Sequence, residues 1–525
     1  MSSRVAQKNL VLAAMIFAVS MTFIDQTIVA IAVPQIQTEL GLSISGVQWA
    51  VNAYLLALAS FFAFGGRLSD TLGHRRMVVI GVVLFAAASA LCGATPRGAG
   101  AEAWIVTFRA LQGVGGAIMY PASLAIVVST FPLRERGRAL AMFFGIAGGL
   151  TAVGPILGGY LTEWTWRAIF WINIPVALIA LALIWVSKPV TEHRRAPMDY
   201  RGAALIAAAA GLSVFGFQQS SIWGWTNAGT GLCIAAGLGL FVVFYRVELR
   251  TASPVIDVSI FRKRPFLVEN LVLGVSMLVF VPIFVFASQY AQISLLQTSS
   301  NSGLFLLYLF IGFVIAAQIG GRMLDRGGAR RPVVLGCAIG AVGFYLWSQH
   351  VTGLRLADQR WYVILAGFGL GLMLGPASTD AVNRAGRLSY GEATGITQTV
   401  RNYAASLGLA ALGSLQIAVF RSHLASALTA QGVPAAAAHH QAGAIAQAGQ
   451  GSGSGQVADI PHFVSLAFAD ATRAVLVGMA VIMAVSTVVA FLGLRPGVQP
   501  DDEAAPAQQS SPRRDVPGPR PEPIR

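Results

Sequence analysis

Residues 65–76 read GGRLSDTLGHRR, and residues 320–331 read GGRMLDRGGARR. From position 65 to position 320 the separation is 255 residues. Each stretch follows one long apolar run and precedes another, so both stand at the same point in a series of hydrophobic segments. This agreement indicates an internal duplication. The identical pairs are Gly65/Gly320, Gly66/Gly321, Arg67/Arg322, Asp70/Asp325, Gly73/Gly328, Arg75/Arg330 and Arg76/Arg331.

The apolar runs around these stretches have the length of membrane-spanning helices. A helix needs about 20 apolar residues to cross the hydrocarbon core of a bilayer. By this measure the chain contains fourteen spans, at 10–31, 48–66, 77–95, 103–124, 138–160, 168–187, 202–220, 229–246, 266–290, 302–321, 331–350, 361–378, 399–421 and 471–494.

The separation of the repeats predicts how these spans are grouped. Six spans with short loops take roughly 180–200 residues at about 20 residues per span, so a separation of 255 leaves room for two more. We therefore predict an all-α polytopic membrane protein of six, two and six helices. Two repeated bundles around a central cavity are the plan of a secondary transporter that works by alternating access.

The composition supports a membrane protein and excludes other classes. Hydrophobic residues make up 55% of the chain and charged residues 11%, against about 25% charged residues in a soluble domain. The mean hydropathy is +0.66. The net charge of +14 comes from short Arg clusters between apolar runs, which does not favour nucleic-acid binding. Cys92, Cys233 and Cys337 each stand alone in an apolar run, so no disulfide framework is expected.

The basic residues also predict the orientation in the membrane. Loops after even-numbered spans carry most of the Arg and Lys residues, whereas loops after odd-numbered spans carry few. Basic loops remain in the cytoplasm. We therefore expect a multi-pass protein of the cell (inner) membrane with both termini in the cytoplasm. The basic loops contain Arg67, Arg75, Arg76, Arg134, Arg136, Arg138, Arg194, Arg195, Arg201, Arg262, Lys263, Arg264, Arg330, Arg331, Arg384 and Arg387.

The predicted organisation has five parts. The parts are a cytoplasmic N-terminus (1–9), an N-terminal six-helix bundle (10–187), a linker with two inserted helices (188–247), a C-terminal six-helix bundle (248–494) with an outer loop at 422–465, and a disordered cytoplasmic tail (495–525).

The outer loop contains two adjacent histidines, His439 and His440. They lack a further ligand at useful spacing, so we expect no metal site.

The repeated loop has residues suited to controlling conformation. Gly65 and Gly66 permit close helix packing. Asp70 can accept hydrogen bonds from helix N-terminal amides and from nearby Arg residues, which would hold one of two states. A loop that only sets topology would explain the Arg residues but not the paired Asp and Gly. The candidate gating residues are Gly66, Arg67, Asp70, Gly73, Arg75, Arg76, Asp325 and Arg330.

Two charged residues, Asp25 and Arg109, lie well inside predicted spans. Each is about six residues from the outer end of its span, or about 9 Å deep at 1.5 Å per residue. Apolar surroundings favour a neutral carboxyl and a nearby cation favours a charged one, so a balanced aspartate could load and release protons. A purely structural ion pair is the alternative. Other charges, namely Glu269, Asp380, Arg401 and Arg473, fall near the predicted span ends.

Polar residues near this pair are candidates for a substrate cavity. Gln112 is one turn from Arg109 and can share its face. The predicted cavity residues are Asn52, Tyr54, Gln112, Gln218 and Gln289, with Gln219 and Gln292 as further polar contacts.

Further motifs identify a family resemblance. The chain resembles the major facilitator superfamily, specifically its fourteen-span drug:proton antiporter branch, over residues 10–494. The motifs are Gly66 to Arg76 in the loop between spans 2 and 3, Phe23 to Val29 and Pro34 in span 1, Arg109 to Gly113 with Gly115 and Gly116 in span 4, Gln398 to Asn402 at the start of span 13, and the span 5 glycines.

The span 5 residues resemble the motif associated with exporters in that family. Their spacing also suits tight helix packing alone, and Pro155 permits a bend. The residues are Gly145 to Gly149, Gly154, Pro155, Gly158 and Gly159.

The resemblance implies export of small hydrophobic or cationic drugs or antibiotics by proton antiport. It implies no cofactor beyond the proton-motive force, and as partners a small-molecule substrate, protons and the lipid bilayer, with no nucleic acid. We expect a monomer. An exporter of an endogenous metabolite or lipid-like compound is the alternative. An enzyme is not expected, because the seven His residues fall in loops or at span ends and no carboxylate pair occurs at depth.

Overall fold

The computed structural model describes residues 2–131, 133–189, 199–383, 390–449, 461–495 and 497. These residues form helices joined by short connections, and no strand occurs among them. Most of the predicted tail at 495–525 and the predicted basic loop residues Arg194, Arg195, Arg384 and Arg387 lie outside the described residues.

The helices follow the predicted apolar runs and extend beyond them at most ends. They are α1 (Ser2–Leu40), α2 (Ile44–Leu72), α3 (His74–Gly93), α4 (Ala101–Thr130), α5 (Leu133–Trp164), α6 (Ala168–Trp171), α7 (Asn173–Ser187), α8 (Tyr200–Trp223), α9 (Ala228–Glu248), η1 (Val258–Arg262), α10 (Arg264–Ile293), α11 (Ser299–Gly327), α12 (Arg330–His350), η2 (Val351–Gly353), α13 (Leu356–Asn383), α14 (Tyr390–Ala430), α15 (Ala435–Gly449) and α16 (His462–Gly493).

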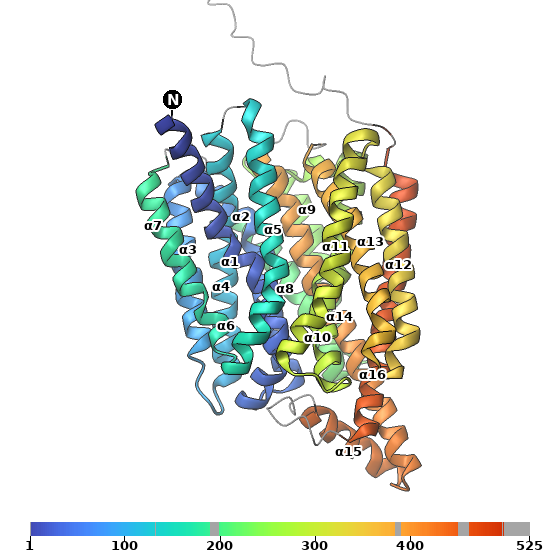
Figure 1. Cartoon of the computed structure of the whole chain (residues 1–525). Coiled ribbons are helices and arrows are strands. Elements are labelled where there is room, and N and C mark those ends of the chain that lie inside the picture. The colour runs from blue at the N-terminus through green and yellow to red at the C-terminus, as the bar shows by residue number, and fades with distance from the viewer. Residues whose placement is uncertain are drawn as a thin grey trace, which may run out of the picture.

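The number of membrane-crossing helices agrees with the sequence prediction. Within the described residues, 13 helical segments are long and apolar enough to cross a membrane, with α6 and α7 together forming one of them. Helix α5, of 32 residues, brings the total to fourteen. The predicted all-α polytopic fold is confirmed (Figure 1).

The two sets of six helices repeat the same packing. Helices α1 to α7 form one half, and α10 to α14 with α16 form the other. Each major pairing in the first half has a counterpart in the second, as expected after duplication. The pairs are α1–α5 and α10–α14, α1–α7 and α10–α16, α2–α4 and α11–α13, α3–α4 and α12–α13, α3–α7 and α12–α16, and α1–α4 and α10–α13.

The halves meet along α2 with α14, α5 with α11, and α1 with α10. The inserted helices α8 and α9 pack on each other, and α8 also packs against α2 and α14. One inserted helix therefore contacts both halves. The fold has six, two and six spans, arranged as two bundles with an interface between them.

The duplicated loop contributes the same backbone features to each half. A Cβ atom on Gly65 would meet the Ala117 carbonyl oxygen, and a Cβ atom on Gly320 would meet the Leu372 carbonyl oxygen. Each glycine thus lets α2 or α11 approach its partner helix closely. Gly73 and Gly328 end these helices with φ of +96° and +79°, which favours glycine.

One predicted loop is largely helical instead. Helix α14 continues to Ala430, and α15 covers 435–449, within the range 422–465 where we expected an outer loop. Leu424, Leu428 and Ala438 are buried, so this Ala-rich segment has an apolar face that packs where the two helices meet. In Figure 1 α15 lies at the end of the molecule opposite the N-terminus.

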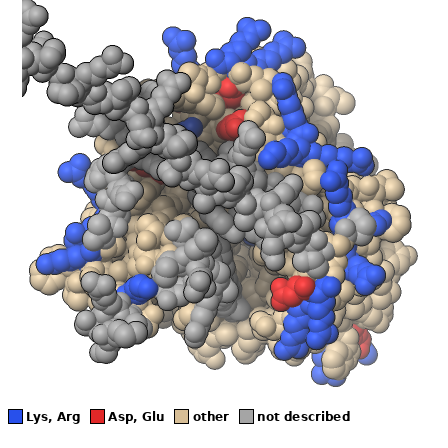
Figure 2. Space-filling view, turned by 90° about the horizontal axis from the view of Figure 1, so that it is seen from above, with Lys and Arg blue, Asp and Glu red and all other residues tan. Residues whose placement is uncertain are grey.

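The face at the N-terminal end of the bundle is rich in cations. Figure 2 looks onto this face and shows Lys and Arg side chains around much of its rim, with few Asp and Glu side chains. This distribution agrees with the alternation of basic loops in the sequence.

Candidate transport site

A buried ion pair joins α1 to α4. The Nη1 atom of Arg109 lies 2.6 Å from Oδ2 of Asp25 and donates a hydrogen bond to it. Gln112 completes the cluster, because its Nε2 donates to Asp25 Oδ1 at 2.9 Å while its Oε1 accepts from Arg109 Nη1 at 2.7 Å. Each of the three side chains contacts the other two. The structure therefore brings together the two residues that the sequence placed at one depth.

The surroundings of the pair exclude water. Asp25 and Arg109 are each 1% exposed. Arg109 Nε donates to the Ala50 carbonyl oxygen at 2.9 Å, and the guanidinium lies 4.5 Å from the centre of the Tyr54 ring. Tyr54 in turn donates to the Thr22 carbonyl oxygen at 3.3 Å. The charged groups are thus neutralised and hydrogen-bonded inside one half of the molecule.

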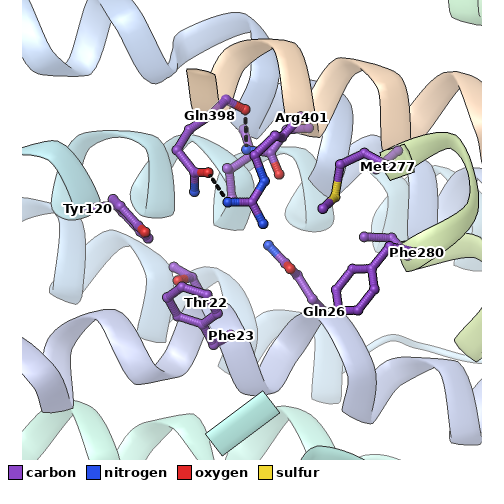
Figure 3. A pocket seen from close by; sticks show the side chains of 12 residues that line it. Thr22, Phe23, Gln26, Tyr120, Met277, Phe280, Gln398 and Arg401 are labelled. Carbon is purple, nitrogen blue, oxygen red and sulfur yellow. Dashed lines mark hydrogen bonds between the residues drawn. The ribbon is translucent and has the colours of Figure 1, made fainter. Parts of the chain in front are cut away.

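A central pocket lies between the halves, beside this cluster. Its free volume is about 20 Å³, enough for about one water molecule. Residues of α1, α2 and α4 form one wall and residues of α10 and α14 form the other (Figure 3). Its lining comprises Thr22, Phe23, Gln26, Leu58, Tyr120, Met277, Phe280, Val281, Gln398, Arg401, Asn402 and Ala405.

Two successive residues of α1 face different sites, the ion pair and the central pocket. Asp25 points into its own half, toward Arg109, whereas Gln26 lines the central pocket. Successive helix positions differ by about 100° in direction, which accounts for this division. A movement of α1 would therefore change the ion pair and the pocket together.

The predicted cavity residues lie elsewhere, since none of the five lines the central pocket. Asn52 donates to Gln218 Oε1 at 2.8 Å and accepts from Ser406 at 2.5 Å, so these amides tie α2, α8 and α14 together. Tyr54 and Gln112 enclose the ion pair, and Gln289 is buried on α10. A sequence shows that an amide side chain lies inside a span. It does not show that a residue of a neighbouring helix forms a hydrogen bond with that amide.

Arg401 is the principal pocket residue that the sequence did not assign to the cavity, although it belongs to the Gln398–Asn402 motif. Its position near the start of an apolar run placed it near a span end. Helix α14 begins earlier, at Tyr390, so Arg401 is about three helical turns inside it. The polar residues between 390 and 402 concealed this extension.

The candidate gating residues form local contacts on the N-terminal side. Asp70 Oδ1 lies 3.8 Å from His74 Nε2, and Arg67 Nη2 donates to the Pro254 carbonyl oxygen at 2.8 Å. In the second copy Arg330 donates to the Phe491 carbonyl oxygen at 2.9 Å. The described contact of Asp70 is with His74, whereas the sequence predicted contacts with Arg residues and helix N-terminal amides, so the gating role of Asp70 stays a prediction.

The other candidate gating residues differ in exposure and in helix packing. Arg76 and Asp325 are exposed, and Arg75 is partly buried. The nearest atom to a Cβ on Gly66 would be Cβ of Pro121 at 3.7 Å, so Gly66 is not needed for close approach.

The span 5 glycines pack against two helices. A Cβ atom on Gly158 would lie 2.9 Å from the Ile28 carbonyl oxygen of α1, and Gly154 also faces α1 at Thr27. Gly159 lies against Ser299 and Ser300 of α11 in the other half, and the Pro155 carbonyl oxygen faces Gly303. These positions therefore join α5 to its own half and to the interface. Gly149 lies within α5.

A second cavity lies between the inserted helices and α14. Its volume is about 230 Å³ and its lining is almost wholly apolar, with residues from α2, α8, α9, the η1 segment and α14. Its lining comprises Ala59, Ile206, Ala210, Phe241, Phe244, Tyr245, Ile256, Val258, Phe261, Ile396, Thr399, Val400 and Tyr403.

The repeated six-helix halves, the inserted pair and the pocket between the halves define a polytopic secondary-transporter fold. The profile of the Major Facilitator Superfamily matches residues 15–409. The chain belongs to this superfamily, and the resemblance seen in its motifs is confirmed.

Similar sequences include named export proteins. The chain is 34% identical to the tetracenomycin C resistance and export protein of Streptomyces glaucescens, covering 90% of both chains. It is 31% identical to a multidrug resistance protein of Mycobacterium tuberculosis, covering 75% of this chain and 73% of the relative. It is 30% identical to a cephamycin export protein of Amycolatopsis lactamdurans, covering 74% and 81%.

Solved structures agree on the fold. A bacterial homolog of the human lysosomal transporter Spinster, in an inward-facing and unoccupied conformation, aligns with a TM-score of 0.61 at 16% identity, covering 93% of this chain and 97% of that one. The xylose transporter of E. coli aligns with a TM-score of 0.53 at 12% identity, covering 79% and 97%.

Proposed function

We propose that this protein exports small hydrophobic or cationic drugs or antibiotics from the cell by proton antiport. The observation that carries the proposal is the buried cluster of Asp25, Arg109 and Gln112 beside a pocket shared by both halves. The names of three relatives, which describe export or multidrug resistance, support the direction of transport.

The cluster offers a way to link proton binding to movement. The charged carboxylate of Asp25 accepts hydrogen bonds from Arg109 and Gln112. Protonation would remove the ion pair, and separating a buried pair typically costs about 3–5 kcal/mol. The protonated state is therefore stable only if α1 and α4 rearrange. Because Gln26 follows Asp25 directly, that rearrangement would also reshape the central pocket.

The proposal also includes the membrane in which the protein lies, its orientation there, and its partners. We place the protein in the cell (inner) membrane with both termini in the cytoplasm, because of the basic rim in Figure 2 and the Arg-rich loops. It would work as a monomer with a small-molecule substrate and protons, and the proton-motive force would replace any cofactor.

The test is transport by purified protein in liposomes with an imposed pH gradient and ethidium as the probe. Asp25→Asn should abolish uphill export, while downhill exchange of ethidium survives. Asp257→Asn is the matched control, because it makes the same change at an exposed carboxylate where Asn also caps a helix. If Asp25→Asn still concentrates ethidium, the proton site lies elsewhere and the ion pair is structural.

A second candidate function is export of a lipid-like compound. The apolar cavity of about 230 Å³ between the inserted helices and α14 favours it. A fluorescent lysophospholipid would then be moved by wild-type liposomes and not by Asp25→Asn. Equal movement in protein-free liposomes would exclude this candidate.

A further inference from the structure

The central pocket contains one arginine that has no acidic partner in the described chain. Arg401 donates from Nη1 to Gln398 Oε1 at 2.8 Å. No described carboxylate lies within ion-pair distance of it. Figure 3 shows its guanidinium reaching into the space between the halves, with Gln26 pointing toward it from α1.

This arrangement leaves N–H donors of the Arg401 guanidinium available for a ligand. A guanidinium has five N–H donors in a planar fork, and Gln398 engages only Nη1. Arg109, in contrast, donates to Asp25, Gln112 and the Ala50 carbonyl oxygen. A cation at membrane depth is costly and is normally found facing a functional cavity. The free donors of Arg401 face the pocket, where a ligand would meet them.

The remaining lining restricts what that ligand could be. The rings of Phe23, Tyr120 and Phe280 and the side chain of Met277 surround the guanidinium with apolar and aromatic surface. Gln26 adds an amide from the opposite half. Such a pocket matches a hydrophobic body that carries one anionic group, because arginine binds a carboxylate through two parallel hydrogen bonds.

We propose that Arg401 binds the anionic group of the exported substrate, and that the substrates include hydrophobic organic acids. This inference rests on the proposed function and adds the chemical class of its substrate. The free volume of about 20 Å³ is too small for such a molecule, so the walls from the two halves must separate before it enters. A site divided between two moving halves closes around its ligand as they return.

The experiment compares a matched acid and ester on the purified full-length protein. Dansylglycine and its methyl ester differ in one negative charge, and binding is followed by dansyl fluorescence in detergent. Arg401→Gln should weaken dansylglycine binding about 10- to 100-fold, the range for a charge-assisted hydrogen bond, and leave the ester unchanged. Arg401→Lys should retain part of the preference for the acid. Arg360→Gln, at an exposed arginine, is the control and should change neither.

The outcomes separate this inference from the proposed function. Dansylglycine binding by Arg401→Gln at wild-type strength, or wild-type binding of acid and ester alike, overturns the inference. Ethidium export in the same preparations shows whether the protein is folded and transports. If ethidium is exported while binding of the acid does not depend on Arg401, the inference fails and the proposed function stands. If the acid binds through Arg401 but wild-type liposomes export neither probe, the proposed function fails.

Discussion

The two halves share a backbone arrangement and differ in where they hold charge. In the first half the carboxylate of Asp25 and the guanidinium of Arg109 form a buried ion pair. At the 255-residue offset these positions correspond to Phe280 and Ile364, and Arg401 corresponds to Ile146. None of the three charges has a counterpart in the other half. Duplication preserved the helix packing, while the polar chemistry was divided between the copies.

The division has a functional interpretation. The buried carboxylates of the second half, Glu269 and Asp380, lie within about two helical turns of helix ends. Its deep charge is the arginine that faces the pocket. In the proposals above, Asp25 of the first half binds the proton and Arg401 of the second half binds the anion.

The largest expected effect tests the contrast between a paired and an unpaired arginine. Arg109→Met would leave the Asp25 carboxylate buried without its cation and should lower the free energy of unfolding by about 3–5 kcal/mol. Arg401→Met removes no ion pair and should leave the melting temperature in detergent unchanged or higher. Similar losses in both variants would mean that Arg401 has a structural partner of equal strength.

The double variant Asp25→Asn with Arg109→Met provides the control for that contrast. It removes both charges, so it should melt above Arg109→Met alone. A double variant no more stable than Arg109→Met would show that packing, rather than the unpaired carboxylate, causes the loss.

A smaller effect tests what the halves share. Gly65→Ala and Gly320→Ala each place a methyl group against a partner carbonyl oxygen, and each should cost about 1–3 kcal/mol of stability. The adjacent glycines have room, since Gly66 meets only Pro121 at 3.7 Å and Gly321 meets nothing within 4 Å. Gly66→Ala and Gly321→Ala should therefore raise stability by about 0.5–1 kcal/mol. Melting temperatures of the four variants measure both signs, and unequal losses at 65 and 320 would contradict equivalent packing.

The smallest effect concerns the two loop aspartates. Asp70 lies 3.8 Å from His74, whereas Asp325 is exposed and the position equivalent to His74 is Ala329. When His74 is protonated this contact is a partly exposed ion pair, and such a pair contributes about 0.2–1 kcal/mol. If Asp70→Asn raises the transport barrier by that energy, transport should slow about fivefold or less. Asp325→Asn should have less effect. Initial export rates at matched protein amounts are the measurement, and a larger loss at Asp325 would reverse the proposed roles.

The sequence predicted the parts of this molecule that depend on length and pattern. Runs of apolar residues correspond to the fourteen helices, and the repeated loop indicated the duplication that the packing shows. Asp25 and Arg109 were recognised because a charge within a long apolar run is conspicuous. Their shared depth followed from the rise of a helix, and the structure joins them at 2.6 Å.

The sequence was less informative about which way each polar side chain points and which residues it contacts. Asn52 and Gln218 lie at the expected depth but bind each other across α2 and α8 rather than lining the pocket. Arg401 was placed near a span end because hydropathy shows where a helix is apolar and not where it begins. The segment after 422 contains too few large apolar residues for a span, yet its alanines and leucines suffice to form a packed helical end.

The unpaired charge of Arg401 also has an electrical consequence. If Asp25 carries one proton inward in each cycle while a monovalent anion leaves, two charges cross the membrane in the same electrical direction. Each charge corresponds to about 2.3 kcal/mol per 100 mV, so the cycle gains about 4.6 kcal/mol per 100 mV of membrane potential. Exchange of a proton for a monovalent cation moves no net charge and responds only to the pH difference. An acid would therefore be expelled largely by the membrane voltage. Collapsing that voltage at constant pH gradient would slow acid export, which would then depend on the pH gradient alone, and would spare cation export.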